Sequence, residues 1–419
     1  MTTTLYICYF GVRQPLVRTQ VIPYLQELAK GGIAVNLLTF EPDLKSEWTP
    51  EQIDAERRSL AELGISWRCL AYHKRPSAIA TAWDIFAGAR LIRKLIAAED
   101  IDILHGRSHV ATLMGALARK YSSHKPKLIF DIRGFFPEEY TDAGVWPENG
   151  LLFRSAKRVE NWLMKESDGF VVLTEKAREI LFEDAGTEEN LKSEIQNSKL
   201  VEIIPCCVDF ETRFPVGIAA RRDEMREKLG MTDRRVFVHV GALGGLYLTR
   251  ELADFMAAAR ENDSKTYALF LTQSDPTEIT ALLRERGFSD TDFFVGRVDP
   301  TEIPIYLSAS DVGLSFVKAT YATQSRSPTK IPEYLAAGLP IIANSGVGDV
   351  DSLIRDDSVG VLIDQFDRES YIDAIEQISQ LGDISEHCRE TAVRRFDLET
   401  VGGVRYRQLY ESVLKTNSE

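Results

Sequence analysis

Residues 5–40 read LYICYFGVRQPLVRTQVIPYLQELAKGGIAVNLLTF, and this stretch indicates the architecture of the whole protein. Its first six residues, Leu5 to Phe10, are an apolar run that predicts a strand. Residues 17–30 are amphipathic and predict a helix, which the glycine pair at 31–32 is expected to end. A second apolar run follows at 34–40. The order strand, helix, strand is typical of a unit in which a helix joins two parallel strands.

The same alternation continues along the chain and predicts two sets of parallel strands. Further strands are expected at 65–70, 101–105, 127–132, 169–173 and 200–204 in the first set, and at 235–240, 267–271, 292–295, 312–316, 340–343 and 360–363 in the second. Residues 205–215 hold two prolines and no periodicity. We therefore predict a first domain at 1–208 and a second at 209–397, with 398–419 crossing back onto the first. The predicted fold class is α/β, with two doubly wound Rossmann-like domains facing a central cleft.

The composition narrows the possible partners. The chain has 419 residues and a formal net charge of −13 at pH 7, so a long phosphate polymer would be repelled and nucleic acid is not expected as a partner. Five scattered cysteines without a Cys-x-x-Cys pair fit a reducing compartment. No apolar run approaches the roughly 18 residues that span a bilayer, and the first strand lacks a basic leader. We expect a cytoplasmic protein, which a basic or amphipathic patch would still allow to rest on the inner face of the membrane.

Doubly wound sheets bind ligands at the carboxyl ends of their strands, so the residues just after each strand are informative. The strand at 235–240 is followed by a glycine-rich turn with Gly241, Gly244 and Gly245. Glycines there let backbone amides approach an anion at the start of a helix. The dinucleotide fingerprint Gly-x-Gly-x-x-Gly is absent, and a tight turn that needs positive φ angles explains the same residues equally well.

The segment SPTKIPEYLAAGLP at 327–340 is more specific. Ser327 or Thr329 is suited to cap a helix of about two turns, which Gly338 ends. The ammonium of Lys330 and the amides of the first turn form a plausible cradle for a diphosphate, and Glu333 is placed to accept hydrogen bonds from ribose hydroxyls. The alternative is that both charged residues are solvated ends of a surface helix.

These segments together resemble a known family. The motifs are VGALGG at 240–245, GRV at 296–298, DVGL at 311–314, the segment 327–340 and, upstream, DILH at 102–105, DGFVVLT at 168–174 and IPCCVD at 204–209. In this order they resemble the GT-B glycosyltransferases of family 4 over nearly the whole chain. The resemblance implies a retaining enzyme that takes a sugar from a nucleotide diphosphate sugar.

The resemblance also suggests roles for individual residues. Glu333 matches the second glutamate of the family's paired-glutamate motif, which holds the donor ribose, but Ser325 stands where the first glutamate is expected. The family's usual cations after the first donor-domain strand are missing, so Lys330 would compensate more of the negative charge of the diphosphate. Arg326 and Arg297 are the next candidates for this role. The donor-binding residues that we predict are Gly241, Gly244, Gly245, Arg297, Val298, Ser325, Arg326, Ser327, Thr329, Lys330 and Glu333.

Polar residues also follow two strands of the first domain. Arg107 and His109 come after the strand that ends at His105, and Asp131 and Arg133 lie at the end of the strand at 127–132. A core would not hold such charges unless they were paired or served a ligand. We predict that these four residues, together with Lys330, are catalytic. A purely structural Arg–Asp pair is the alternative, and a lone histidine at a buried strand end, such as His105, is more often a core residue.

The sequence therefore predicts a metal-independent, retaining glycosyltransferase without a cofactor. No Ser-His-Asp or Cys-His arrangement is visible, and hydrolysis is disfavoured because Glu138 and Glu139 are adjacent and cannot be given the geometry of two flanking carboxylates. The expected partners are a nucleotide-sugar donor and a saccharide or lipid-linked acceptor. By family analogy the setting is the assembly of a cell-surface polysaccharide or glycolipid. Two alternatives stay open, a nucleotide-sugar epimerase of similar architecture and a catalytically silent nucleotide-binding subunit, the latter suggested by Ser325.

Overall fold

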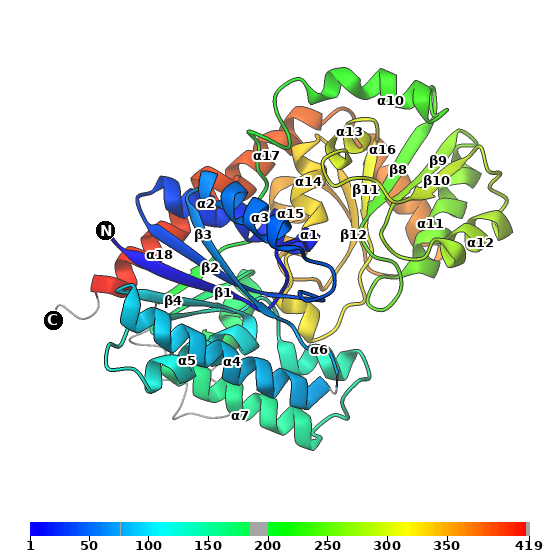
Figure 1. Cartoon of the computed structure of the whole chain (residues 1–419). Helices are drawn as coiled ribbons and strands as arrows, with labels where there is room; N and C mark the ends of the chain where they lie inside the picture. Colours follow the sequence, from blue (N-terminus) through cyan, green and yellow to red (C-terminus); the bar gives the residue numbers. More distant parts are fainter. Residues whose placement is uncertain (76, 184–199, 416–419) are drawn as a thin grey trace. The chain divides into compact units, whose positions relative to one another are not determined.

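The computed structural model describes residues 1–75, 77–183 and 200–415 (Figure 1). The stretch 186–198, which the sequence suggests is a surface insertion, lies outside the described residues. The chain forms two compact units: unit 1 comprises Met1–Pro205 and Leu398–Glu419, and unit 2 comprises Cys206–Asp397.

Unit 1 is built on a seven-stranded parallel sheet in the order β3-β2-β1-β4-β5-β6-β7. The strands are β1 (Thr3–Cys8), β2 (Ala34–Glu41), β3 (Ile65–Ala71), β4 (Ile103–Arg107), β5 (Lys127–Asp131), β6 (Gly169–Val172) and β7 (Leu200–Ile203). The order reverses between β1 and β4, which makes the carboxyl ends of these two strands the switch point where doubly wound sheets bind ligands.

Helices cover both faces of this sheet, with α4, α5 and α7 side by side along one of them (Figure 1). The helices are α1 (Pro15–Gln20), α2 (Ile22–Lys30), α3 (Pro50–Glu62), α4 (Ser77–Ala98), α5 (Ser108–Lys120), α6 (Phe136–Asp142), α7 (Leu151–Glu166), α8 (Glu175–Arg178), η1 (Glu179–Glu183), η4 (Leu398–Gly403) and α18 (Val404–Lys415). Within the described residues, no helix is both long and apolar enough to cross a membrane.

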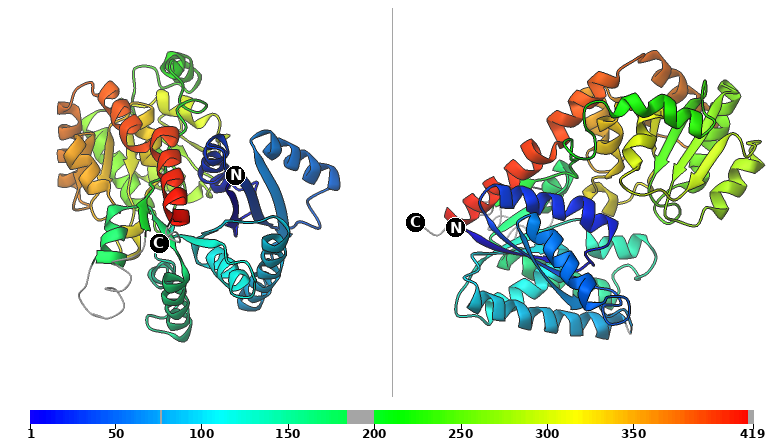
Figure 2. Two further views of the ribbon diagram at one scale, coloured as in Figure 1. Left: turned by 90° about the vertical axis from the view of Figure 1, so that its left-hand side faces the viewer. Right: turned by 45° about the horizontal axis from the view of Figure 1, so that its top comes forward.

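The segment 398–415 belongs to unit 1. Its helix α18, red in Figures 1 and 2, contacts β7, and its residues Tyr406, Leu409 and Tyr410 are buried. The Tyr410 hydroxyl lies 3.2 Å from Thr4 Oγ1 of β1 and 2.8 Å from His105 Nδ1 of β4. These contacts connect α18 to the central strands of the sheet.

Unit 2 has a six-stranded parallel sheet in the order β10-β9-β8-β11-β12-β13, with its switch point between β8 and β11. The strands are β8 (Arg235–Val240), β9 (Thr266–Leu271), β10 (Phe293–Gly296), β11 (Val312–Ser315), β12 (Ile341–Asn344) and β13 (Gly360–Ile363). The helices are η2 (Ile218–Arg221), α10 (Arg222–Lys228), α11 (Thr249–Asn262), α12 (Thr277–Glu285), α13 (Ile303–Ser308), η3 (Ala322–Ser325), α14 (Lys330–Ala336), α15 (Val350–Asp357), α16 (Arg368–Gln380) and α17 (Ser385–Phe396). The predicted class of two doubly wound α/β domains is confirmed.

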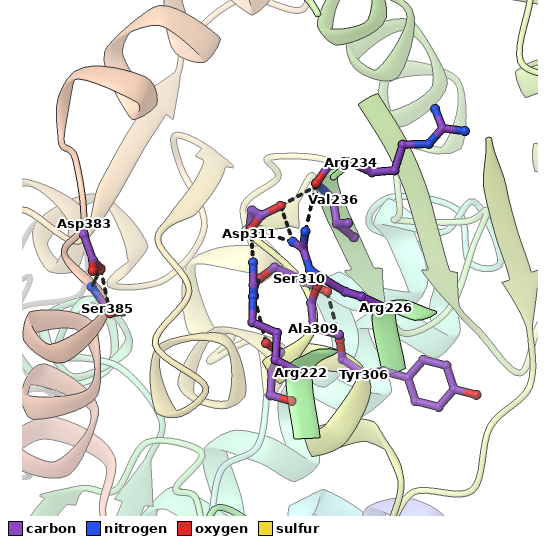
Figure 3. A network of polar contacts seen from close by, with 11 residues as sticks. Arg222, Arg226, Arg234, Val236, Tyr306, Ala309, Ser310, Asp311, Asp383 and Ser385 are labelled. Carbon is purple, nitrogen blue, oxygen red and sulfur yellow. Dashed lines mark hydrogen bonds and ion pairs between the residues drawn. The ribbon is translucent and has the colours of Figure 1, made fainter. Parts of the chain in front are cut away.

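An ionic network fixes α10 against the sheet of unit 2 (Figure 3). The Asp311 carboxylate, just before β11, accepts hydrogen bonds from Arg226 at 2.7 and 2.8 Å and from Arg222. It also accepts one from the Val236 amide at 2.7 Å. The Asp311 carboxylate thus connects a helix to two neighbouring strands. This structural role is sufficient to explain the aspartate in the DVGL motif.

Two local expectations need correction. The boundary between the units lies at Pro205–Cys206 rather than at 208, because the Val208 amide donates to the Phe396 carbonyl and so joins unit 2. The side chains of Ser327 and Thr329 do not cap α14. Thr329 is the N-cap residue without a side-chain cap, and Ser327 Oγ instead accepts a hydrogen bond from the Cys206 amide at 3.1 Å.

Candidate active site

The glycine turn, residues 241–245, follows β8 at the switch point of unit 2. Gly241, Gly244 and Gly245 have φ angles of 124°, 76° and 63°, so the backbone here adopts conformations that side chains disfavour. The Gly244 amide donates to Thr249 Oγ1 at 2.8 Å, which ties the turn to the start of α11. The predicted tight turn is therefore present, and it lies at an edge where ligands of such sheets bind.

Lys330, the first residue of α14, reaches this turn. A Cβ atom on Gly241 would lie 3.4 Å from Lys330 Nζ, which is ordinary van der Waals contact, so the ammonium lies beside the backbone of the turn. The side chain is buried, and Nζ has no hydrogen-bond partner among the described residues. Its cationic contact is with the ring of Tyr247, 4.7 Å from the ring centroid. Burial lowers the pKa of Lys330 to about 7.

A buried ammonium without a hydrogen-bond acceptor is unusual, because burying a charge costs free energy unless it is paired. His239 of β8 faces the same region, and burial together with the charge of Lys330 holds its pKa well below the ordinary value, so it is neutral at pH 7. Lys330, beside the glycine turn, is thus a positive site whose Nζ has an unused donor. It suits a phosphate group.

Glu333 lies one turn further along α14 and pairs with Arg213, which donates from Nη1 to Oε1. Arg213 also donates from Nη2 to the Pro300 carbonyl at 3.3 Å, so it joins α14 to the loop after β10. Burial raises the pKa of Glu333, and the charge of Arg213 counteracts that rise. The arginine fixes one carboxylate oxygen in place.

The remaining predicted donor-site residues of the 325–329 segment have local contacts. Ser325 is buried, and its hydroxyl donates to the Ala322 carbonyl at 2.7 Å. The backbone amide of Arg326 donates to the Thr323 carbonyl at 3.1 Å. Thr329 is exposed. Ser325 therefore bonds within its own 3-10 turn.

Arg297 and Val298 lie in the loop after β10. Arg297 is exposed and donates from Nη2 to the Gln273 carbonyl at 3.0 Å, and the Val298 carbonyl accepts from Gln273 Nε2 at 3.5 Å. These contacts join the loops after β9 and β10. Lys330 thus lies beside the glycine turn, and Arg213 links Glu333 to the loop at Pro300. Arg297 instead lies beside Gln273.

In unit 1 the structure brings His105, Arg107, Asp131 and Arg133 together, and we call these four residues the unit 1 charge cluster. Arg107 ends β4 and pairs in register with Asp131 at the end of β5. Arg107 Nη1 lies 3.7 Å from Asp131 Oδ2, and Arg133 Nη1 lies 3.5 Å from Oδ1. His105 Nε2 is 3.6 Å from Oδ2.

Asp131 is the only carboxylate of the cluster and is fully buried. Burial alone would raise its pKa, but the charges of Arg133 and Arg107 and the contact with His105 hold it well below the usual range. The hydroxyl groups of Tyr6 and Tyr406 donate to Oδ2 at 3.2 and 3.4 Å. The aspartate is therefore ionised at neutral pH and centres the cluster.

His109 does not join this cluster. Its Nε2 lies 2.8 Å from Glu160 Oε2 of α7, and its ring stacks on Phe136 with 5.2 Å between centroids. Glu160 also accepts from Lys157. These contacts place His109 in the packing between α5 and α7, where a structural role explains it. Its catalytic role stays a prediction.

Sequence reasoning missed several partners of the candidate site. Arg213, Tyr247 and Tyr406 contact predicted residues from distant segments, and no motif marks them. The sequence favours a core role for His105, although this residue ends the DILH motif that carries the family resemblance. Its burial is complete, yet it lies against the cluster.

Comparison with protein families identifies the class. Residues 17–191 match the family model "Glycosyl transferase 4-like domain", and residues 221–395 match "Glycosyl transferases group 1". The two models follow one another in the order of units 1 and 2 and together cover most of the chain. The protein belongs to the GT-B glycosyltransferases and is a glycosyltransferase. Because both models are those of transferases, the epimerase alternative is not favoured.

Solved structures support the same fold. A glycosyltransferase from Rickettsia africae has a TM-score of 0.72 at 16% identity, with 99% of each chain covered. Sucrose-phosphate synthase from Thermosynechococcus elongatus has a TM-score of 0.70 at 16% identity, again with 99% of each chain covered. Anabaena HepE in complex with UDP and glucose has a TM-score of 0.68 at 14% identity, covering 98% of this chain and all of that one (100%). A search of curated protein sequences found no match.

Proposed function

We propose that the protein transfers a sugar from a nucleotide diphosphate sugar to a saccharide or lipid-linked acceptor, with retention of anomeric configuration and without a metal ion. The observation that carries this proposal is the buried ammonium of Lys330, which lies against the glycine turn at the switch point of unit 2. Within the described residues, it has no hydrogen-bond acceptor. Such a site suits the diphosphate of the donor.

The reaction depends on stabilising the leaving group. As the bond between the sugar and the diphosphate breaks, negative charge accumulates on the departing phosphate oxygen. Lys330 would stabilise that charge in a buried, low-dielectric site. The acceptor hydroxyl forms the new bond to the anomeric carbon, and its proton passes to the departing diphosphate, so no protein nucleophile is needed.

Binding of an anion would also change the state of Lys330. With a pKa of about 7, the side chain is only partly protonated at neutral pH in the unliganded protein. A diphosphate stabilises the charged form and raises this pKa. Donor binding would therefore take up a proton above pH 7.

The ribose would bind at Glu333. Arg213 holds Oε1 of this carboxylate, which leaves Oε2 to accept hydrogen bonds from the vicinal hydroxyls. Several similar structures contain UDP or a UDP-sugar, including the HepE complexes with UDP and with UDP-glucose, so UDP is the first nucleotide to test. A catalytically silent subunit is the second candidate, since Ser325 is bonded within its own turn.

The experiment is a thermal-shift panel of UDP, GDP, ADP and their sugars, followed by a transfer assay. We expect one nucleoside diphosphate to raise the melting temperature clearly above the others, and the matching sugar donor to turn over equally with and without EDTA. The anomeric proton signal of the product would keep the configuration of the donor. A product with the inverted anomeric configuration would refute retention. Loss of turnover in EDTA would refute metal independence. Nucleotide binding without turnover of any donor would favour the silent subunit.

We further propose that unit 1 rests on an anionic membrane surface, as a lipid-linked acceptor requires. Along one side of α4, Ile79, Trp83 and Phe86 are 71%, 58% and 60% exposed. The same side continues with exposed residues Arg90, Arg93 and Lys94. The acidic residue of α4, Asp84, is buried. We call these six side chains the basic-aromatic face.

Exposed aromatic rings beside cations are typical of helices that lie in a membrane interface. The protein as a whole has a net charge of −13, so three cations without an exposed acid on this helix are a local feature. Each Lys or Arg near an anionic surface contributes about 1 kcal/mol. The rings would enter the lipid boundary while the cations bind headgroups.

Co-sedimentation with vesicles tests this contact. We expect the protein to bind vesicles of phosphatidylcholine and phosphatidylglycerol but not of phosphatidylcholine alone, and Trp83→Ser with Phe86→Ser to abolish binding. The control is Val216→Ser, which removes a 96% exposed apolar side chain from unit 2. Equal binding of all variants would show that the basic-aromatic face is not the contact.

A further inference from the structure

The switch point of unit 1 presents a row of residues at the carboxyl ends of three neighbouring strands. Cys8 of β1 pairs in register with Arg107 of β4, which pairs with Asp131 of β5. Helix α5 begins at the next residue, Ser108, with φ of 67°, an uncommon value for a residue other than glycine. The chain therefore turns sharply at the position where this type of sheet binds ligands.

Gly106 explains how close α5 comes to the sheet. A Cβ atom at this position would lie 2.4 Å from the Thr112 Cα and 2.6 Å from its amide nitrogen, closer than real atoms approach. Only a glycine allows the first turns of α5 to pack directly on β4. The amides at the start of this 13-residue helix, which lack partners within the helix, are thereby brought to the strand ends beside Arg107.

Arg107 itself lacks the partners that a buried guanidinium normally has. Its side chain is 3% exposed, and within the described part of the chain it donates no hydrogen bond. Its ion-pair contact is Nη1 to Asp131 Oδ2 at 3.7 Å, which is beyond hydrogen-bond distance. A guanidinium has several N–H donors, and buried ones normally bind a carboxylate or phosphate through two of them.

Arg107 shares its acidic neighbour with another cation. Asp131 also pairs with the guanidinium of Arg133, at 3.5 Å. Two other titratable groups beside Arg107 are neutral at pH 7, because burial lowers the pKa of His105 and raises the pKa of Cys8 to about 11. Burial likewise raises the pKa values of Tyr6, Tyr406 and Tyr410 above the usual range. Asp131 is therefore shared by Arg107 and Arg133 and does not serve Arg107 alone.

We infer that Arg107, at the start of α5, binds an oxyanion, a carboxylate or a phosphate group, carried by the substrate that unit 1 receives. This inference rests on the proposed function, in which the diphosphate of the donor belongs to Lys330 in unit 2. The oxyanion is then a separate group, carried either by the acceptor or by the sugar being transferred. An oxyanion would accept the hydrogen bonds that Arg107 has to donate.

The first test measures binding of inorganic phosphate to the full-length protein by calorimetry in the presence of saturating UDP, which occupies the site in unit 2. We expect the wild type to bind phosphate and Arg107→Gln to bind it at least tenfold more weakly, with Arg107→Lys in between because a point charge replaces a bidentate group. Arg119→Gln is the matched control, since Arg119 of α5 is already paired with Asp168 at 2.5 Å. Equal phosphate affinity in the wild type and Arg107→Gln would overturn the inference, as would no binding to the wild type.

A second variant separates this result from the proposed function. Lys330→Gln should lose UDP affinity and keep phosphate binding at Arg107. If the wild type binds no nucleotide but Lys330→Gln still binds phosphate in an Arg107-dependent way, the proposed function fails and the anion site stands. Melting curves of all variants show whether Arg107→Gln is folded. The Arg107→Lys measurement keeps the test decisive if Arg107→Gln is not.

Two competition arms identify the source of the oxyanion. If the transferred sugar carries it, UDP-glucuronate should displace phosphate whereas UDP-glucose should not. If the acceptor carries it, phosphate should bind equally well beside either donor, and glucose 6-phosphate, but not glucose, should displace it. Displacement of phosphate by both UDP-glucose and glucose, whose sugar rings carry no charge, would show that Arg107 does not recognise charge. That result would refute the inference.

Discussion

Arg213 Nη1 donates a hydrogen bond to Glu333 Oε1, and the same guanidinium bonds to the Pro300 carbonyl at 3.3 Å. A residue just after the crossover between the units thus orients a carboxylate more than a hundred positions away. Because one oxygen of Glu333 is held, the ribose hydroxyls would meet an acceptor that is fixed before they arrive. This relationship makes the role of Glu333 testable without the acceptor.

Glu333→Gln should weaken UDP binding by roughly 1.5 to 3 kcal/mol, the range for hydrogen bonds to a charged group. The comparison ligand is 2′,3′-dideoxy-UDP, which cannot donate from the ribose. Wild-type protein should prefer UDP to the dideoxy compound, and the variant should show little preference. If both proteins discriminate equally between the two ligands in calorimetry, Glu333 does not contact the ribose.

Lys330→Ala should lower kcat by roughly 100-fold, because it removes a charge that stabilises the departing diphosphate. Lys330→Arg should retain more activity. UDP binding by the wild type should weaken as the pH rises through about 7, the pKa of the unliganded lysine, while Lys330→Arg should bind with no such dependence. A wild-type affinity that stays constant between pH 6 and 9 would contradict this assignment.

Lys330 also makes the stability of the unliganded protein depend on pH. The folded-state pKa of about 7 lies below the ordinary value of 10.5, so between these pH values the unfolded chain binds the extra proton and stability rises with pH. Lys330→Met removes the buried charge. We expect the variant to be the more stable protein below pH 7, by a few kcal/mol, and the difference to shrink towards pH 10.5. Denaturant unfolding at several pH values checks this, and a constant difference would show that Lys330 is not buried as a cation.

Arg133→Ala should abolish transfer and leave UDP affinity nearly intact, since Arg133 belongs to unit 1 and the nucleotide is assigned to unit 2. Asp131→Asn is the structural control. Removing the buried carboxylate takes away the ion-pair partner of the buried Arg107 and should cost about 3 to 5 kcal/mol of stability. A folded, inactive Arg133→Ala supports a catalytic role, whereas an unfolded one assigns the residue to the architecture.

His109→Ala separates two roles for that residue. If its bond to Glu160 is structural, the variant should lose about 1 to 3 kcal/mol of stability and keep its turnover at temperatures where it is folded. If His109 is catalytic, as its position after β4 suggests, turnover should be lost with UDP affinity intact. Assays at 10 °C, with a melting curve for each variant, distinguish the two results.

The class of fold could be predicted from the sequence because each strand and helix is encoded locally. Apolar runs such as Leu5 to Phe10 have the period of strands, and glycines end the helices. The start and end of an element are less well encoded: β1 is Thr3–Cys8, not 5–10, because tertiary pairing with β2 sets the limits. The caps of α14 were wrong for a similar reason, since the hydroxyl of Ser327 bonds across to Cys206.

The candidate site was predictable only in part. Lys330, Glu333 and the glycine turn lie in short motifs and could be found by spacing. Their partners Arg213 and Tyr247 could not, because contacts between distant segments leave no local pattern. The sequence places His109 and Arg107 after the same strand but does not predict where their side chains point. His109 lies between helices, and Arg107 lies at the strand ends.

The return of α18 to unit 1 determines the order in which the molecule can be completed on the ribosome. Residues 206–397 are contiguous, so unit 2 can close its core as soon as it has left the exit tunnel. Unit 1, although most of it is synthesised earlier, lacks Tyr406, Leu409 and Tyr410 until translation has passed unit 2. During that interval the Asp131 carboxylate would lack Tyr406, and His105 would lack Tyr410. The first unit to be synthesised is thus the last to finish folding, and a truncation before residue 404 should leave unit 2 folded while exposing the interior of unit 1 to chaperones and proteases.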